Sequence, residues 1–221
     1  MDDFIKKYKN QLIIFGFVVM VYFLYFHNIW AYKLLDVDET RYVDMSRVMH
    51  STKDFLTLYL NNEYFFEKPP LYFWLENISF YVFRTINEFS ARIPGVLGTI
   101  ITSAALFFTV KKITKNKAQA IFSTLILMTS IEYIVLSKIA ILDILLSNMI
   151  TLSVLCGFMT FFSKENHKKY FWWGFYVFSA LAILSKGIPG FVIPFASMFF
   201  IGLYTKKLKE YFKPKYFIVG L

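Results

Sequence analysis

Apolar stretches about as long as a bilayer is thick recur along this chain of 221 residues. A transmembrane helix needs about 20 mostly apolar residues. We therefore predict spans at residues 12–32, 91–110, 118–137, 139–162, 170–184 and 188–204, with the start of a further one at 216. The hydrophobic share of 57% and the mean hydropathy of +0.50 agree with this pattern, which excludes an ordinary soluble globular protein.

The two ends of the chain differ in character. Residues 12–32 are too long for the apolar region of a signal peptide, which has about 7–15 residues, so they are expected to be a signal anchor. Residues 217–221 look like the first turns of a helix that is cut off, which indicates a fragment or a truncated product; a short interfacial tail is the alternative. The single cysteine, Cys156, lies in an apolar run and excludes a disulfide framework.

The net charge of +9 is explained by where the basic residues lie. Lysine and arginine in short loops are retained on the cytoplasmic side of a membrane. The lysine clusters alternate with the predicted spans so that all fall on one side. They comprise Lys6, Lys7 and Lys9; Lys111, Lys112, Lys115 and Lys117; Lys164, Lys168 and Lys169; and Lys206, Lys207, Lys209, Lys213 and Lys215. The N-terminus is then cytoplasmic, residues 33–88 are external, and no nucleic-acid partner is needed.

The first external segment, residues 33–88, is expected to hold two helices that lie on the membrane. Tyr42, Met45, Val48 and Met49 recur at helical spacing, and Asp36 or Asp38 is the expected N-cap. Pro69-Pro70 begins a second apolar helix that is too short for a comfortable span. The predicted fold is therefore an all-α polytopic membrane protein with juxtamembrane helices.

Ionisable residues stand at the external ends of the predicted spans. A charge inside the bilayer costs at least about 2.5–3.5 kcal/mol, so such a residue is a functional candidate. Asp143 lies near the start of its span, Lys138 just before it, and Lys186 in the next external turn. The purely structural alternatives are that the lysines snorkel to the membrane surface and that Asp143 forms a helix cap or a structural ion pair. We expect these residues to share one mixed acidic and basic site with Asp38, Glu39, Glu67 and Lys68.

Such a site suits transfer of a group from a lipid phosphate. A carboxylate can take the proton from an attacking hydroxyl or amine, while lysine or arginine neutralises the departing phosphate. Glu67-Lys68 also has a purely structural interpretation, as a solvated turn before a helix. His27, His50 and His167 form no metal-binding pattern, so no metal site is predicted; a divalent cation held by Asp38, Glu39 or Glu67 is left open.

Five short motifs together resemble the bacterial lipid A aminoarabinose transferases. Those enzymes belong with the protein O-mannosyltransferases in the C-type superfamily of membrane glycosyltransferases. The motifs are Asp-Glu-Thr-Arg-Tyr at 38–42, Glu-Lys-Pro-Pro-Leu at 67–71, Arg-Ile-Pro at 92–94, Leu-Asp at 142–143 and Leu-Ser-Lys-Gly at 184–187. Each motif alone is weak, but all five follow the order of the family and fall on one predicted side of the membrane.

The resemblance implies a role for each matching residue. Asp38 would be the principal catalytic carboxylate, with Glu39 beside it. Lys68 would face the carrier phosphate. Arg92 would begin a helix, or equally form an ion pair that holds the first loop. The substrate-binding set that the resemblance implies is Arg41, Glu67, Lys68, Arg92, Asp143 and Lys186. The C-terminal extramembrane domain that family members usually carry is absent from these 221 residues.

The expected function is therefore a multi-pass glycosyltransferase of the bacterial inner membrane with its site on the periplasmic side. It would move a sugar from an undecaprenyl-type polyprenyl phosphate to a lipid A-type glycolipid, a surface glycan or a protein hydroxyl, with no required cofactor. The alternative is an inactive or lipid-phosphate-binding membrane subunit. A transporter fits less well, because it would place polar groups near the midplane of the membrane.

Overall fold

The computed structural model describes residues 2–35, 37–206 and 208, and most of them are helical. The helices are α1 (Asp2–Val21) with a π-helical turn (Tyr22–Phe26), α2 (Asp38–Thr52), α3 (Leu71–Phe83), α4 (Glu88–Thr114), α5 (Lys117–Thr129), α6 (Ile131–Ser137), α7 (Leu142–Phe162), α8 (Glu165–Lys186) and α9 (Ile188–Tyr204). One short hairpin joins β1 (Leu58–Leu60) to β2 (Glu63–Phe65). The expected all-α polytopic fold is confirmed, with this hairpin as an addition.

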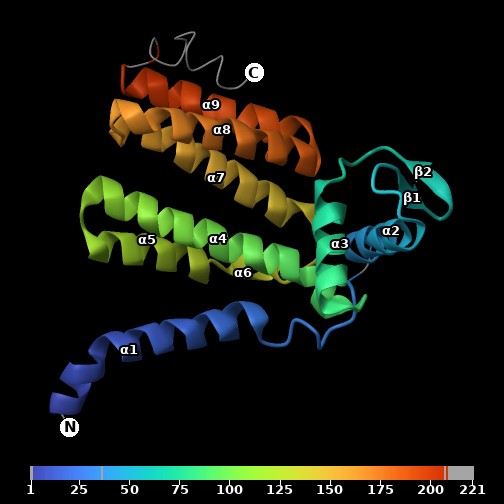
Figure 1. The fold of residues 1–221 in the computed structure, drawn as a ribbon, viewed down its shortest axis with the longest axis horizontal. Coiled ribbons are helices and arrows are strands. Elements are labelled where there is room, and N and C mark those ends of the chain that lie inside the picture. The colour runs from blue at the N-terminus through green and yellow to red at the C-terminus, as the bar shows by residue number, and fades with distance from the viewer. Residues whose placement is uncertain (1, 36, 207, 209–221) are drawn as a thin grey trace.

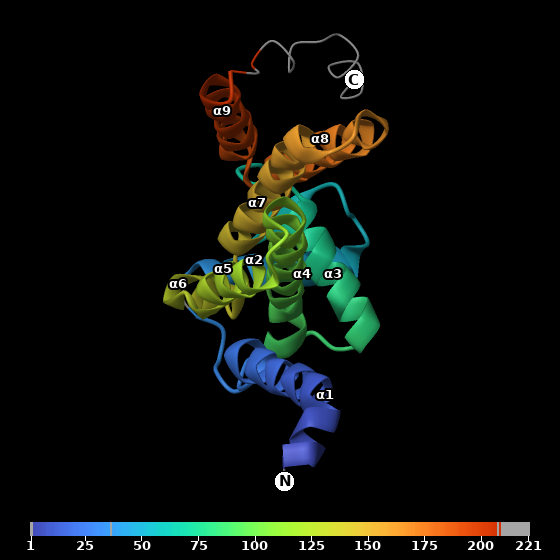
Figure 2. The same cartoon turned by 90° about the vertical axis from the view of Figure 1, so that its left-hand side faces the viewer.

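The long helices lie side by side in a bundle (Figure 1). α7 packs against α4, α8 and α9, and α4 packs against α5. Figures 1 and 2 agree in placing α1 at one edge of the bundle and α9 at the opposite edge. Within the described residues, α4 and α7 are long and apolar enough to cross a membrane, and α5 with α6 can form a third, bent span. Shorter apolar helical stretches are Ile14–Phe26 and Ile188–Tyr204.

Several predicted boundaries need correction. The span expected at 118–137 is broken at Ser130, whose extended backbone separates α5 from α6 with a bend of 62°. The helix expected at 12–32 ends at Phe26, because His27 is extended and Asn28 has a left-handed backbone. α8 begins at Glu165, before the predicted 170–184. The helix expected to start at 216 lies outside the described residues, as do Asp36, Lys207, Lys209, Lys213 and Lys215.

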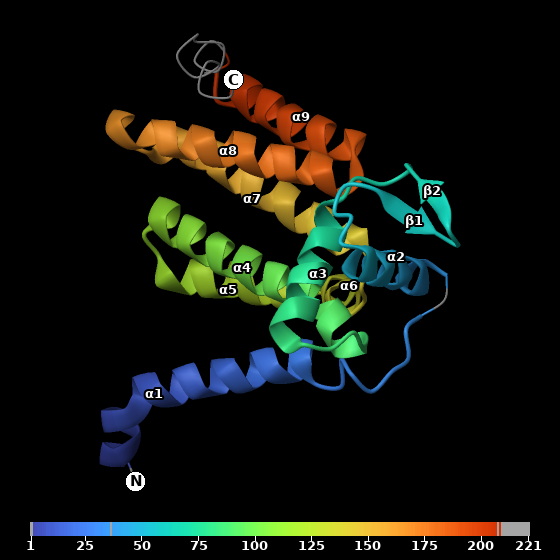
Figure 3. The same ribbon diagram turned by 45° about the vertical axis from the view of Figure 1, so that its right-hand side comes forward.

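The two kinds of loop lie at opposite ends of the bundle. α2, α3 and the hairpin gather at one end, which Figure 3 shows together with α6. The lysine-bearing turns between α4 and α5 and between α7 and α8 lie at the other end, as does the start of α1. This is the arrangement that the alternation of charges along the sequence predicts.

Local sequence explains the elements within residues 33–88. α3 follows Pro70, a residue suited to the start of a helix because its ring fixes φ and its missing N–H leaves no hydrogen bond unmade. The hairpin turns at Asn61 and Asn62, which both have a positive φ, as the favoured two-residue turns require. α2 has Val37 as its N-cap and no side-chain cap, so the expected capping by Asp38 is wrong; Asp38 is instead the first helical residue.

A hydrophobic cluster fixes this segment to the bundle. Met45 and Met49 from α2 pack with Tyr72 and Phe73 from α3 and with Leu145 from α7, and all five are buried. Burial of a large apolar side chain contributes about 1.5–3 kcal/mol. α2 and α3 are therefore a rigid part of the fold, and they hold their polar side chains in fixed positions.

Candidate active site at the end of the bundle

A buried ion pair joins α2 to α4. Arg92 Nε donates to Glu39 Oε1 at 2.7 Å, and Nη2 donates to Oε2 at 3.0 Å. The side chains are 3% and 1% exposed, respectively. Two parallel hydrogen bonds of this kind give the strongest and most directional form of a salt bridge.

Arg92 also binds the chain that leads into α2. Nη1 donates to the carbonyl oxygens of Ile29 at 2.6 Å and Tyr32 at 3.0 Å, and Nη2 donates to the carbonyl oxygen of Lys33 at 3.1 Å. A guanidinium has five N–H donors, so all of them are used. Arg92 thus forms the ion pair that holds the first loop, which was the alternative role expected for it.

Glu39 is equally saturated. Its Oε2 accepts from the Leu35 amide at 2.7 Å, and its Oε1 accepts from the Ala140 amide at 2.8 Å. Burial alone would raise the pKa of Glu39, but the hydrogen bonds from Arg92 and from these two amides outweigh it and hold that pKa below its usual value. Both oxygens are occupied, so this carboxylate ties α2 to the loop before α7.

Residues predicted from different motifs meet around Tyr42, one helical turn after Asp38. Burial raises the pKa of the Tyr42 hydroxyl most, followed by the negative charges of Asp38 and Asp143 and, more weakly, of Glu67, while Arg41 opposes them. Three predicted carboxylates and one predicted cation therefore lie within electrostatic range of this one hydroxyl. Tyr42 was expected as an apolar position and as the last residue of the first motif, but not as a site residue; its spacing of four residues from Asp38 was the available signal.

These groups are accessible where Glu39 is not. Asp38 and Glu67 are exposed, and Arg41 and Lys68 are half-buried. Within the described part of the chain, Asp38, Glu67 and Lys68 make no side-chain hydrogen bond or ion pair. Lys68 stands directly before Pro69, at the entry to α3. Their charged atoms are thus available to a ligand.

Asp143 and Lys186 form a second ion pair at the same end of the bundle. Asp143 lies in the first turn of α7 and Lys186 in the last turn of α8, positions that the two helix dipoles favour. Gly187 has φ of 78°, which lets the chain turn directly into α9. Lys138 does not join this pair, and its Nζ instead donates to the His27 carbonyl oxygen at 3.3 Å.

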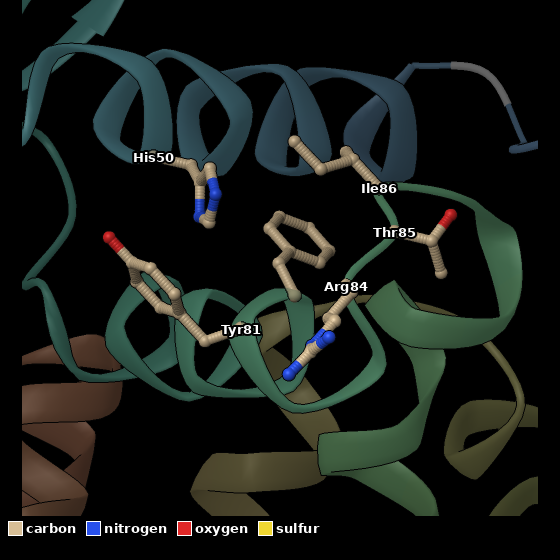
Figure 4. A pocket seen from close by; sticks show the side chains of 6 residues that line it. His50, Tyr81, Arg84, Thr85 and Ile86 are labelled. Atoms are coloured by element: carbon tan, nitrogen blue, oxygen red, sulfur yellow. The ribbon is translucent and has the colours of Figure 1, made fainter.

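A hollow of about 290 Å³ lies elsewhere, at the C-terminal ends of α2 and α3 (Figure 4). Its lining is His50, Phe80, Tyr81, Arg84, Thr85 and Ile86. The His50 ring points from α2 toward α3, and its Nδ1 lies 3.2 Å from Asn77 Oδ1. None of the predicted site residues lines this hollow.

The described residues include no group of three His, Cys, Asp or Glu side chains close enough to hold a metal ion. Glu39 has no free oxygen for a ligand bond, because its partners occupy both. A cation on Asp38 or Glu67, left open above, is not tested by this finding.

Comparison with known proteins gives consistent relatives. The chain is similar to the undecaprenyl phosphate-alpha-4-amino-4-deoxy-L-arabinose arabinosyl transferase of Wigglesworthia glossinidia brevipalpis, with 30% identity over 92% of this chain and 36% of that protein. The enzyme of the same name from Pectobacterium atrosepticum is 26% identical over 95% of this chain and 37% of its own length. The chain thus spans little more than a third of the length of these two relatives.

The fold matches a solved structure closely. The crystal structure of ArnT from Cupriavidus metallidurans bound to undecaprenyl phosphate superimposes with a TM-score of 0.86 at 21% identity, covering 94% of this chain and 39% of that one. The apo form of the same protein gives a TM-score of 0.81. These matches confirm the expected fold of the C-type membrane glycosyltransferases.

The family itself is settled by a sequence profile that covers nearly the whole chain. The profile of the family described as dolichyl-phosphate-mannose-protein mannosyltransferase matches residues 10–221. The chain therefore belongs to the dolichyl-phosphate-mannose-protein mannosyltransferase family.

Proposed function

We propose that this chain carries the catalytic face of a membrane glycosyltransferase. It would move a sugar from a polyprenyl phosphate such as undecaprenyl phosphate to a lipid A-type glycolipid, a surface glycan or a protein hydroxyl. The observation that carries the proposal is the meeting of Asp38, Glu67, Asp143 and Arg41 around Tyr42 at one end of an apolar bundle. The names of the relatives, which include a lipid-carried aminoarabinose, support the class of donor.

The proposed reaction is a displacement at the anomeric carbon of the sugar. The acceptor oxygen forms a bond to that carbon while the bond from carbon to the carrier phosphate breaks, and its electron pair leaves with the phosphate. Asp38 takes the proton of the acceptor hydroxyl, because it is exposed and has no competing hydrogen bond. The Asp38 carboxylate is therefore ionised before transfer and protonated after it.

Arg41 and Lys68 are assigned to the phosphate. The phosphate gains negative charge as the bond breaks, so a cation placed beside it is worth more in the transition state than before it. Arg41 stands on α2 next to the Asp38 turn, and Lys68 is held at the start of α3 by two prolines. Lys186, already beside Asp143, is the third candidate cation.

Glu39 and Arg92 are assigned a positioning role instead of contact with substrate. Both are buried and fully hydrogen bonded. Glu39 is the immediate neighbour of Asp38, so the anchor fixes the backbone from which the proposed base projects. This replaces the expected catalytic role of Glu39 and the expected substrate contact of Arg92.

The test of the function is Asp38→Asn. The amide keeps the shape of the side chain but cannot accept the proton, so transfer from sugar-loaded undecaprenyl phosphate is expected to fall by about 10²–10⁴-fold. Thermal unfolding is expected to be unchanged, since Asp38 is exposed. Asp44→Asn, on the same helix, is the matched control and should keep transfer. Wild-type turnover by Asp38→Asn would show that Asp38 has no catalytic role and is only a residue at the end of a helix.

A second candidate is a lipid-phosphate-binding subunit without transferase activity, because the half-buried cations Arg41 and Lys68 would hold a phosphate whether or not transfer follows. Binding of undecaprenyl phosphate to the purified chain, with no transfer of its sugar under any acceptor condition, would support this candidate over the transferase.

The topology is part of the proposal: residues 33–88 are external, and the lysine-bearing turns are cytoplasmic. The opposite ends of the bundle that these segments occupy support it. In a Cys156→Ala background, a membrane-impermeant thiol reagent should label Glu63→Cys in intact cells and Lys117→Cys only after permeabilisation. The reverse pattern would place the site on the cytoplasmic side.

A further inference from the structure

We propose that Glu76 is a neutral carboxylic acid that fixes α2 against α3 and thereby positions the Asp38 end of α2. The inference deepens the proposed function, since it concerns the support of that same site. Glu76 touches none of the proposed reacting atoms, so it is a positioning residue.

The geometry begins with a buried contact between the two external helices. Glu76 on α3 and Ser46 on α2 are both 0% exposed, and the Ser46 hydroxyl is hydrogen bonded to Glu76 Oε2. One turn earlier on α3, Tyr72 is also 0% exposed, and its side chain interacts with Glu76. Within the described residues, Glu76 Oε1 and the Tyr72 hydroxyl have no well-formed hydrogen bond.

The balance of buried charge leaves Glu76 without a cation. Among the described residues, Arg92 is the one buried lysine or arginine, and its charge is balanced by Glu39. All five N–H groups of Arg92 are committed to Glu39 and to backbone carbonyls. An ionised Glu76 would therefore add an uncompensated charge to a dry junction, which is strongly unfavourable.

A neutral acid satisfies the same atoms. A protonated carboxyl has one O–H donor and keeps an acceptor oxygen. The Ser46 hydroxyl donates to Oε2, and an O–H on Oε1 would donate to the Tyr72 hydroxyl oxygen, so both unpartnered atoms would gain a bond. Burial, together with the nearby negative charge of Glu39, raises the pKa of Glu76 well above its usual value, although contacts with Ser46 and Tyr72 lower it.

The junction connects to the site through α2. Ser46 lies four residues after Tyr42, which lies four after Asp38, so all three stand on one face of the helix. A shift of about 1 Å in a reacting group can cost roughly 10²-fold in rate. The charged or titratable groups around Glu76 are Glu39 from α2, Tyr72 from its own helix and Arg92 from α4.

The first arm of the test needs no substrate. Infrared spectra of the purified full chain at pH 7 are expected to show a protonated-carboxyl band that Glu76→Gln lacks. Ser46→Ala, which keeps the acid but removes its partner, is expected to shift that band. Glu63→Gln, at an exposed position, is the matched control and should leave the band in place. Absence of the band from the wild-type protein would overturn the proposal.

The second arm uses pH. Because the folded-state pKa of Glu76 is raised, its contribution to stability is fully present below the unfolded-state pKa of about 4.3 and is lost as the pH rises through the folded-state pKa. Wild type should therefore lose stability relative to Glu76→Gln as the pH rises. Parallel melting curves for the two proteins from acid to alkaline pH would contradict a neutral Glu76.

The third arm measures transfer. Glu76→Gln is expected to keep transfer, whereas Glu76→Ala should lower kcat by up to about 10²-fold with little change in KM for the carrier. Equal transfer by both variants, where wild type is active, would remove the positioning role. If no protein transfers sugar, the proposed function fails, while the infrared and melting arms still decide the protonation of Glu76 and its hold on α2.

Discussion

Two ion pairs at the same end of the bundle have opposite characters. The side chains of Arg92 and Glu39 are 3% and 1% exposed, whereas those of Lys186 and Asp143 are 32% and 48% exposed. The first pair is closed by hydrogen bonds to backbone groups on two segments, the connection before α2 and the loop before α7, while the second is a single contact between two helix ends. Burial, and not the presence of opposite charges, separates the closed pair from the pair whose charged groups stay accessible.

The difference has an energetic basis. An exposed ion pair contributes about 0–1 kcal/mol, because water already solvates both charges. Removing one partner of a buried pair costs about 3–5 kcal/mol, because the other charge is left without compensation. A lysine ammonium has three donors, so Lys186 keeps capacity for a phosphate, whereas Arg92 has none left.

The largest expected effect comes from opening the buried pair. Arg92→Met should destabilise the protein by about 3–5 kcal/mol, because it leaves the Glu39 carboxylate buried and alone. Thermal unfolding in detergent or nanodiscs measures the loss. Arg47→Met, which opens the exposed pair with Asp44, is the control and should cost less than about 1 kcal/mol. Equal melting temperatures for the two variants would break the comparison.

Acid should open the same buried pair without a mutation. The pKa of Glu39 is depressed, so the stability it contributes is present above the unfolded-state pKa of about 4.3 and is lost as the pH falls through the lower folded-state pKa. The free energy of unfolding, followed from neutral to acid pH, should decline in wild type and in Asp143→Asn alike. Glu39→Gln should lack this part of the decline, and a decline of wild-type size in that variant would contradict the assignment.

Among the accessible cations, Lys68 should matter for binding and not for folding. Lys68→Met keeps the aliphatic stem and removes the charge, so it should weaken polyprenyl-phosphate binding by about 1.5–3 kcal/mol, the usual worth of a hydrogen bond to a charged group. Lys68→Arg should recover part of the affinity. Binding titrations at low and high salt measure both, and unchanged affinity in the Met variant would move the phosphate toward Lys186.

The smallest expected effect on stability belongs to the exposed pair. Lys186→Met should change the free energy of unfolding by only about 0–1 kcal/mol, while slowing transfer if the ammonium faces the leaving phosphate. Unfolding and transfer measured on the same preparation separate the two effects. A stability loss as large as that of Arg92→Met would show that exposure is a poor guide to the role of these pairs.

Much of the architecture is predictable from the sequence, because membrane crossing imposes a length and a composition. The span expected at 91–110 falls within α4 and that at 188–204 matches α9, while the span expected at 139–162 begins three residues before α7 and ends with it. The break at Ser130 is not predictable in this way, since α5 and α6 together are apolar enough to pass for one span. The pair Asn61-Asn62 is typical of a hairpin turn, but the hairpin was not predicted because the whole segment was expected to be helical.

The site is predictable as a set of residue types but not as a set of roles. Asp38 and Glu39 are adjacent in the sequence and chemically similar, yet successive helical residues face different directions. One is exposed, and the other is enclosed by Arg92 and two backbone amides. Only the fold places the Leu35 and Ala140 amides around the second carboxylate, so only the fold separates a candidate base from an anchor.

The contacts of Arg92 with the carbonyl oxygens of Tyr32 and Lys33 bear on mutational tolerance. These contacts depend on the path of the backbone. They do not involve the side chains, which are exposed at both positions. In a mutational scan, substitutions at 32 and 33 that preserve the backbone should be accepted readily, whereas deletion of one residue there would move the carbonyls out of register with the guanidinium. The number of residues in this connection is therefore constrained more tightly than their identity.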